Sequence, residues 1–320
     1  MVNIKRKVIK QGNGTLTITL PKGWTDDIGL TGNDEVDITP NQNNLIVTPN
    51  KPQKQKKISI DVDKFERLSF AKFLIACYEQ GFDTIDMHFT KSHVTSWRGG
   101  KEDISKVINF FVTRLIGFEV LSQTKNRVSI GNISEKYLKF DSILSRIFFL
   151  IEEYFTNLIN AFETNDYASL KESQIQHDNI TKLIALGSRI IYDSPEFSKV
   201  EAMNLVTILN LLDKITDFIR DAYRNTSLYN KKISRNTLDL AVNAFKFLEL
   251  YRHFFNKFSY EEINKLDDLR GEVKDLHIQC VAKVPKESAI NSNFDALVDT
   301  LHGAIKPRIA LELAKGKLGN

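Results

Sequence analysis

Residues 4–47 read IKRKVIKQGNGTLTITLPKGWTDDIGLTGNDEVDITPNQNNLIV, and this stretch decides the fold of the N-terminal part of the chain. Polar and apolar residues alternate from Thr15 to Leu20, which is typical of a half-buried strand. Gly29, Gly32 and the run 41–44 mark turns around further short strands. Three or four short strands bury too little apolar surface to offset their conformational entropy. We therefore expect this module to be stable only when it pairs with a second copy.

Basic residues are concentrated in the first ten positions, where no acidic residue offsets them, although the whole chain carries a net charge of only +4. Lys and Arg contacts to phosphates supply most non-specific affinity for DNA, so two copies of this segment could hold a duplex. The alternative is an exposed edge strand that carries lysines to prevent aggregation. The four residues are Lys5, Arg6, Lys7 and Lys10.

The order of features in this stretch resembles the AbrB/SpoVT swapped-hairpin DNA-binding domain. The match runs from Arg6-Lys7-Val8 through Leu20-Pro21 to Gly29-Leu30 and Asp34. The resemblance implies that residues 1–50 form a β head in which two copies interlock, dimerise and bind double-stranded DNA. The chain departs from the family after the proline turn, where two acids, Asp26 and Asp27, stand in place of basic residues. The predicted DNA contacts are therefore Lys5, Arg6, Lys7, Lys10 and Lys22.

Length and composition indicate a folded chain of two or three domains, with 320 residues of which 42% are hydrophobic and 26% charged. The longest apolar runs fall far short of the ~18 to 20 residues needed to cross a bilayer. No secretory signal is visible, so we expect a cytoplasmic protein without membrane insertion. Cys77 and Cys280 lie far apart in apolar settings, as reduced core thiols do.

The middle of the chain predicts a small α/β domain over residues 58–133, after a polar and basic linker at 50–57. The pattern predicts a strand at 58–62, a helix at 64–80, a strand at 84–89, a helix at 101–115 and then a hairpin that turns at Lys125-Asn126. Gly81 is predicted to stop the first helix. The segment Trp97-Arg98-Gly99-Gly100 is interpreted as a connector between strand and helix.

From residue 134 to 320 apolar residues recur at three- and four-residue spacing, which indicates an all-helical half. Turn signals, among them Asn225 to Asn230, divide it into six helices of roughly 25 to 30 residues, and we expect two bundles of three. Residues 212–219 and 294–301 repeat one acidic pattern 82 positions apart. This spacing favours a duplicated three-helix unit with repeats at about 136–226 and 230–315. The repeated acids are Asp213, Asp217, Asp295 and Asp299.

Each repeat therefore places two carboxylates four residues apart, on one face of a helix. Such a pair repels itself unless a cation or a basic side chain neutralises it. Carboxylates on facing helices bind hard cations and also iron or manganese, so Mg²⁺, Mn²⁺, Fe²⁺ and Zn²⁺ are the cofactors to consider. The alternative is a solvated face whose acids pair with neighbouring bases such as Lys214 and Arg220.

The helical half resembles the PhoU family of duplicated three-helix units, whose third helices carry a Leu-acid-Arg-x-x-Asp signature. Residues 212–217, LDKITD, fit it with Asp and Lys in place of the usual Glu and Arg, while 294–299, FDALVD, keep both acids and lose the base. The second-helix signature is weaker, because Thr181 stands where the family has an acid. The resemblance implies that the paired acids can carry metal ions.

The middle segment looks like the connecting domain of archaeal phosphate-uptake regulators, which join an AbrB-type head to a PhoU body. The matching residues are Ala76 to Ile85 and Arg114 to Val120. The resemblance implies a multi-domain α+β homodimer that regulates transcription of phosphate-uptake genes. The alternative is a phosphate-signalling adaptor that docks on a transporter or sensor kinase, with the head serving only to dimerise. No catalytic motif is visible, so we expect no enzyme.

Overall fold

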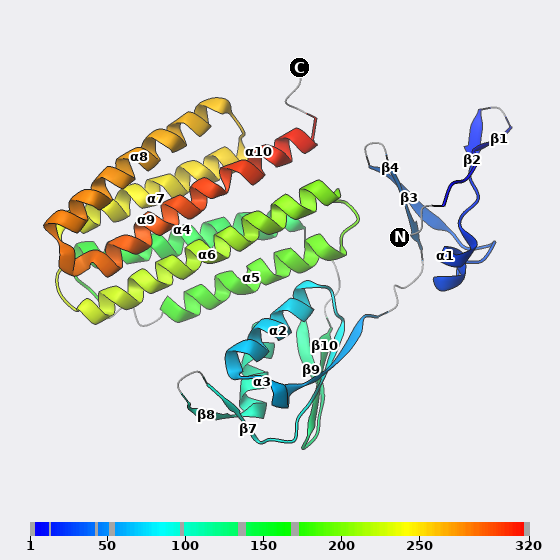
Figure 1. The fold of residues 1–320 in the computed structure, drawn as a ribbon, viewed down its shortest axis with the longest axis horizontal. Helices are drawn as coiled ribbons and strands as arrows, with labels where there is room; N and C mark the ends of the chain where they lie inside the picture. The colour runs from blue at the N-terminus through cyan, green and yellow to red at the C-terminus, as the bar shows by residue number, and fades with distance from the viewer. Residues whose placement is uncertain are drawn as a thin grey trace. The chain divides into compact units, whose positions relative to one another are not determined.

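The computed structural model describes residues 4–12, 14–41, 44–50, 55–96, 99–133, 139–167 and 173–316. The chain divides into two compact units, Met1–Lys54 and Gln55–Asn320. Figure 1 shows strands and one short helix in the first unit, and a sheet packed with helices in the second. The second unit contains both the predicted α/β segment and the helical half.

The first unit consists of two antiparallel hairpins and one short helix. Strand β1 (Ile9–Gln11) pairs with β2 (Thr15–Thr17), and the glycines of the turn that the structure describes, Gly12 and Gly14, have positive φ angles of 64° and 93°. Helix α1 (Lys22–Asp27) follows the proline turn. Strand β3 (Val36–Asn41) pairs with β4 (Asn44–Pro49) in a separate sheet. The predicted short strands are confirmed, although β2 ends three residues before Leu20.

The residues of the first unit whose burial the structure describes form no core. None of residues 4–12, 14–40 and 44–50 is buried, and its large apolar side chains are more than half exposed at Val8, Ile9, Leu16 and Ile38. The two hairpins form separate two-stranded sheets, and an isolated hairpin is marginally stable in water. A single copy of this unit therefore leaves apolar surface in water that a folded domain normally buries.

The second unit begins with a four-stranded sheet in the order β5-β6-β10-β9. Strand β5 runs parallel to β6, and β10 is antiparallel to both β6 and β9. Helices α2 and α3 lie on one face of this sheet (Figure 1), where a ring contact between Phe70 and Phe111 joins them. The elements are β5 (Lys57–Asp61), a 3-10 turn (Val62–Lys64), α2 (Arg67–Glu79), β6 (Thr84–His88), α3 (Ile104–Val112), β9 (Phe118–Gln123) and β10 (Arg127–Asn132).

The second predicted helix of this segment starts later than expected. Residues Lys101–Asp103 form strand β8, which pairs with β7 (His93–Thr95) in a small hairpin that the sequence pattern did not predict. Helix α3 begins only after Asp103, whose carboxylate accepts a hydrogen bond from the backbone N–H of Lys106 at 3.0 Å. Gly99 and Gly100 lie between two strands, so they do not connect a strand to a helix, while Trp97 and Arg98 fall outside the described residues.

The C-terminal half is helical, as expected, with seven α-helices among residues 139–167 and 173–316 where six were predicted. The predicted sixth helix breaks at Gly303–Ala304, because Pro307 has no N–H to donate to the carbonyl of Gly303. Asn225 does not end a helix either, since α6 continues to Tyr229, and the residue that caps it, Asn230, has a left-handed φ of 46°. The helices are α4 (Phe140–Thr164), α5 (Ser173–Asp193), α6 (Lys199–Tyr229), α7 (Arg235–Asn256), α8 (Tyr260–Lys283), α9 (Ser288–Gly303) and α10 (Ile305–Ala314).

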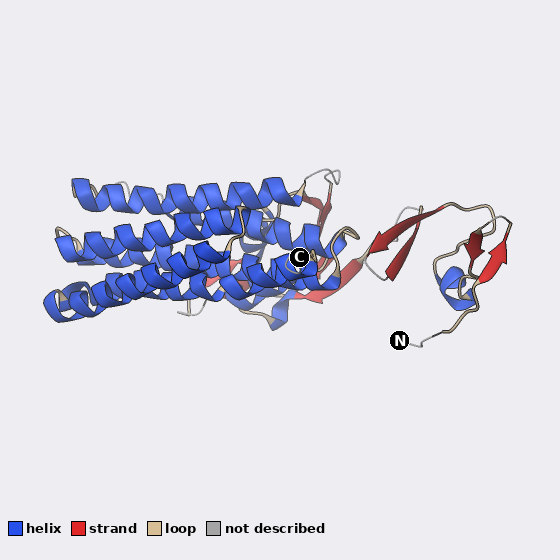
Figure 2. Cartoon of the chain, turned by 90° about the horizontal axis from the view of Figure 1, so that it is seen from above, coloured by secondary structure: helices blue, strands red, loops and turns tan. Residues whose placement is uncertain are grey.

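The two repeats pack together as one continuous bundle, so the two sets of three helices expected from the sequence share one core. Helix α6 packs against α9 and α4 against α7. Figure 2 shows these helices lying side by side along a common direction. The rings of Phe155 on α4 and Phe294 on α9 stack with centroids 5.6 Å apart, so the repeats share one apolar core.

A buried arginine joins the α/β part to the bundle. Arg189 on α5 is buried and donates hydrogen bonds to the backbone carbonyls of Tyr78 at 2.8 Å and Phe82 at 2.9 Å. Gly81 has a positive φ of 74° and lies against the side chain of Asp193, where a larger residue would clash.

No helix in the described part of the chain is long and apolar enough to cross a membrane.

Candidate functional site

The basic residues predicted to contact DNA are all exposed on the first unit. Lys10 lies in β1 opposite Leu16, and Lys22 is the first residue of α1. Lys5, Arg6 and Lys7 precede β1, so the basic strand of the sequence prediction is shorter than expected and only Lys10 belongs to it. All five positive charges are available to a large anionic partner.

The acidic residues after the proline turn lie on the same short helix as Lys22. Asp26 and Asp27 are the last two residues of α1 and are exposed. A carboxylate repels phosphate, so the C-terminal end of α1 is a poor surface for DNA. The charge of this unit therefore favours contacts through the segment before β1 and the first turn of α1.

The carboxylate pair of the second repeat is neutralised by α8. The ammonium of Lys274 donates to Asp295 Oδ1 at 2.7 Å and to Asp299 Oδ2 at 2.6 Å, while the guanidinium of Arg270 donates to Asp299 Oδ1 at 2.9 Å. Burial opposes ionisation of Asp299, but the hydrogen bonds from these two bases hold the pKa of its carboxyl below its usual range. His277 Nδ1 lies 3.4 Å from Asp295 Oδ1.

The carboxylate pair of the first repeat is neutralised only in part. Arg220 donates to Asp217 Oδ1 at 2.6 Å, and the same oxygen lies 3.1 Å from His177 Nε2 on α5. Burial opposes ionisation, yet the hydrogen bond with His177 and the charge of Arg220 hold the pKa of Asp217 below its usual range. Asp213 behaves differently, because burial and then the charge of Asp217 raise the pKa of its carboxyl.

A third carboxyl group, from the sheet-covering helix, belongs to the same region. Burial, and after it the negative charge of Asp213, raise the pKa of Glu79 to about 7. Glu79 is the last residue of α2, while Asp213 lies in the middle of α6. The α/β part and the bundle thus each contribute one acid with a raised pKa, and the charge of Asp213 acts on Glu79.

These surroundings do not fit a resident divalent metal ion. Asp217, Asp295 and Asp299 already accept hydrogen bonds from positively charged donors. No group of three or more His, Cys, Asp or Glu side chains able to hold a metal ion occurs in the part of the chain that the structure describes. Asp217, Asp295 and Asp299 therefore match the alternative of acids paired with neighbouring bases, while the metal site stays a prediction from the carboxylate spacing.

Sequence reasoning identified the four aspartates but missed most of their partners. Lys214 and Arg220 were recognised as nearby bases, and both lie against Asp217. Arg270, Lys274 and Glu79 were not connected with the pairs. Arg270 and Lys274 are four residues apart and so share a face of α8. This matching i, i+4 spacing of bases was the available signal, but the sequence does not say which helix faces which.

The comparisons with known proteins give little further information. Neither the protein-family models nor the curated proteins contain a match to this chain. Among solved structures, a PhoU-like phosphate regulatory protein from Shewanella oneidensis MR-1 is similar at 17% sequence identity and a TM-score of 0.41. The similarity covers 55% of this chain and 100% of that chain. At this level the similarity carries no conclusion about function.

Proposed function

We propose that this protein is a homodimeric DNA-binding regulator of transcription, in which two copies of the first unit combine into one head. One observation carries the proposal: the first unit buries none of residues 4–12, 14–40 and 44–50, and its five predicted DNA-binding side chains are all exposed. Its apolar surface requires a partner, and a second copy supplies the same two hairpins by symmetry. Dimerisation doubles the positive charge available to a duplex.

The phosphate part of the proposal rests on the sequence resemblance to regulators of phosphate uptake. In this proposal the bundle of the second unit senses phosphate status or binds a signalling partner. The local charge supports contact with DNA phosphates, because Lys5, Arg6 and Lys7 are consecutive and no acidic residue occurs in the first ten positions. This charge does not select a particular operator, since contacts to the phosphate backbone position a protein on DNA without reading the base sequence.

The test is the salt dependence of duplex binding by the full chain. Replacing Lys5, Arg6, Lys7 and Lys10 by Ala is expected to weaken binding to all duplexes alike and to flatten the plot of log affinity against log salt by about 0.9 for each lost phosphate contact. The matched control removes four exposed lysines of the second unit, Lys72, Lys125, Lys232 and Lys286. Equal effects of the two variants on affinity and slope would contradict the proposed head contacts.

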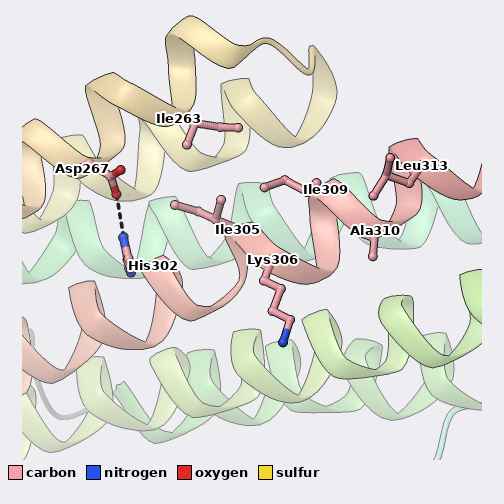
Figure 3. Close-up of a pocket in the computed structure, with 8 residues that line it drawn as sticks. All are labelled: Ile263, Asp267, His302, Ile305, Lys306, Ile309, Ala310 and Leu313. Atoms are coloured by element: carbon pink, nitrogen blue, oxygen red, sulfur yellow. Dashed lines mark hydrogen bonds and ion pairs between the residues drawn. The ribbon is translucent and has the colours of Figure 1, made fainter. Parts of the chain in front are cut away.

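A second candidate function is an adaptor that docks on a phosphate transporter or a sensor kinase. An apolar groove of about 450 Å³ between α8 and α10 favours this candidate. Figure 3 shows Ile305 and Ile309 of α10 facing Ile263 of α8, with Asp267 and His302 joined at one end of the groove. The two polar groups are 2.7 Å apart. An open apolar groove of this kind can accept the apolar face of a partner helix.

The two candidates predict different effects of the same variants. Ile309→Glu places a charge in the groove and is expected to abolish binding of a partner helix while leaving the salt-dependent DNA affinity unchanged. The four-residue alanine variant of the head is expected to do the reverse. A protein that binds no duplex at low salt would leave the adaptor as the function to pursue.

A further inference from the structure

The ammonium of Lys274 bridges the two carboxylates of the second repeat. Its Nζ atom lies 2.7 Å from Asp295 Oδ1 and 2.6 Å from Asp299 Oδ2, so a single positive charge from α8 contacts both acids of α9. The side chains of Lys274 and Asp295 are 30% and 20% exposed, respectively, which places this contact partly out of water. Two short, charge-assisted hydrogen bonds at such a position hold the ammonium firmly.

We infer that Lys274 is the built-in cation of this carboxylate pair and that it keeps divalent metal ions out of the site. The charges support this assignment. Two carboxylates contribute two negative charges, and Lys274 with Arg270 contributes two positive charges, so the cluster is neutral without any ion. The pair therefore lacks the excess negative charge that attracts a hard cation.

The geometry leads to the same conclusion. A divalent ion bound by both aspartates would contact the oxygens that Lys274 now contacts, at ~2.0 to 2.6 Å. It would then lie next to the ammonium, and two positive charges this close repel strongly in a partly buried position. The metal and the lysine side chain thus compete for one place. Removing the ammonium leaves Asp295, Asp299 and the nearby His277 as potential ligands after small rotations of their side chains.

This assignment makes the α8–α9 contact of the second repeat independent of metal supply. A tethered ammonium cannot dissociate or be removed by a chelator, in contrast to a bound ion. Burial works against the charged form, but the two aspartates raise the pKa of Lys274 above its usual range. The ammonium therefore stays charged across the neutral pH range.

The test uses the full chain and five variants, with the melting temperature measured in EDTA and in excess Mn²⁺. Wild type is expected to melt at the same temperature in both conditions. Lys274→Met is expected to melt lower in EDTA, because the two carboxylates then repel each other, and to recover part of the loss in Mn²⁺. Lys274→Met/Asp299→Asn is expected to recover without metal and to ignore Mn²⁺. Lys274→Arg keeps the charge and should behave as wild type.

The matched control is Lys265→Met, which removes a more exposed ammonium that also contacts two carboxylates, those of Glu261 and Glu262. This variant should not respond to Mn²⁺. Equilibrium dialysis with Mn²⁺ gives a second readout that does not depend on unfolding: wild type should retain no ion at this pair, and Lys274→Met should retain one. Mn²⁺ binding by wild type that Asp299→Asn abolishes would overturn the inference. A Lys274→Met protein that neither loses stability in EDTA nor binds Mn²⁺ would also overturn it. If that variant does not fold, the dialysis of wild type decides the question alone.

Discussion

The guanidinium of Arg189, on α5, donates a hydrogen bond of 2.8 Å to the backbone carbonyl of Tyr78, on α2. A second bond of 2.9 Å reaches the carbonyl of Phe82, and Asp83 Oδ1 lies 3.2 Å away. One buried side chain thus binds carbonyls in the last turn of α2 and just beyond it, and connects the α/β part to the bundle. The two parts belong to one compact unit, Gln55–Asn320.

Replacing this arginine is expected to be costly. Arg189→Met removes the positive charge and with it the hydrogen bonds to the carbonyls of Tyr78 and Phe82 and to Asp83 Oδ1. We expect the free energy of unfolding to fall by about 3 to 5 kcal/mol, as it does when one member of a buried, hydrogen-bonded ion pair is removed. Urea titration followed by circular dichroism measures the change.

The control for this prediction is Arg235→Met. Arg235 lies 2.9 Å from Asp239 within one helix, but its side chain is 80% exposed. Such a pair contributes only about 0.3 to 0.5 kcal/mol. Similar losses in the two variants would mean that Arg189 does not hold the sheet to the bundle.

Glu79 makes the stability of the second unit depend on pH. Burial and the charge of Asp213 raise the pKa of Glu79 to about 7 in the folded protein, above the ordinary value of 4.5 that applies when the chain is unfolded. The folded state therefore binds this proton more tightly than the unfolded state does. The resulting stabilisation is fully present below pH 4.5 and is lost as the pH rises through about 7.

Glu79→Gln should remove this pH dependence, because the amide does not ionise. We expect the variant to be more stable than wild type at pH 8 by about 1 to 2 kcal/mol, a value reduced for the partial exposure of the side chain. The two proteins should differ little at pH 5. The measurement is urea unfolding at pH 5, 6, 7 and 8. Parallel stability curves for wild type and variant would show that Glu79 does not titrate in this range.

Much of the fold follows from local signals in the sequence. Gly81 ends α2 because only glycine adopts its positive φ of 74° without strain. Asn41 of β3 pairs with Asn44 of β4, at the place where the sequence predicts a turn. The small hairpin of β7 and β8 was missed because each of its strands has only three residues, too few to establish an alternation. The break before α10 was missed because Pro307 lies inside an otherwise continuous helical pattern.

The candidate site was predictable only in part, since its charges come together through tertiary packing. The spacing of Asp295 and Asp299 placed them on one face of α9, but periodicity does not reveal that α8 presents Lys274 to that face. The same holds for Glu79, whose pKa is raised by burial and by the charge of Asp213, a residue more than one hundred positions later in the chain. Sequence spacing therefore gave the acids, and the packing of the helices determined what neutralises them.

The last prediction concerns the oligomeric state. Leu16 on β2 and Ile38 on β3 are 66% and 56% exposed in the single chain, although they belong to different hairpins. If a second copy covers both, a charged substitution at either position should disrupt the dimer, because it would bury a carboxylate without a partner. We expect wild type to show twice the chain mass of 36.6 kDa in light scattering, and Leu16→Asp and Ile38→Asp to approach the monomer mass.

Leu228→Asp is the matched control, since Leu228 is 77% exposed at the end of α6 in the other unit. Because the second unit has its own core, all three variants should retain its helical circular dichroism. A Leu16→Asp protein that keeps the wild-type mass, or a Leu228→Asp protein that loses it, would move the interface away from the hairpins.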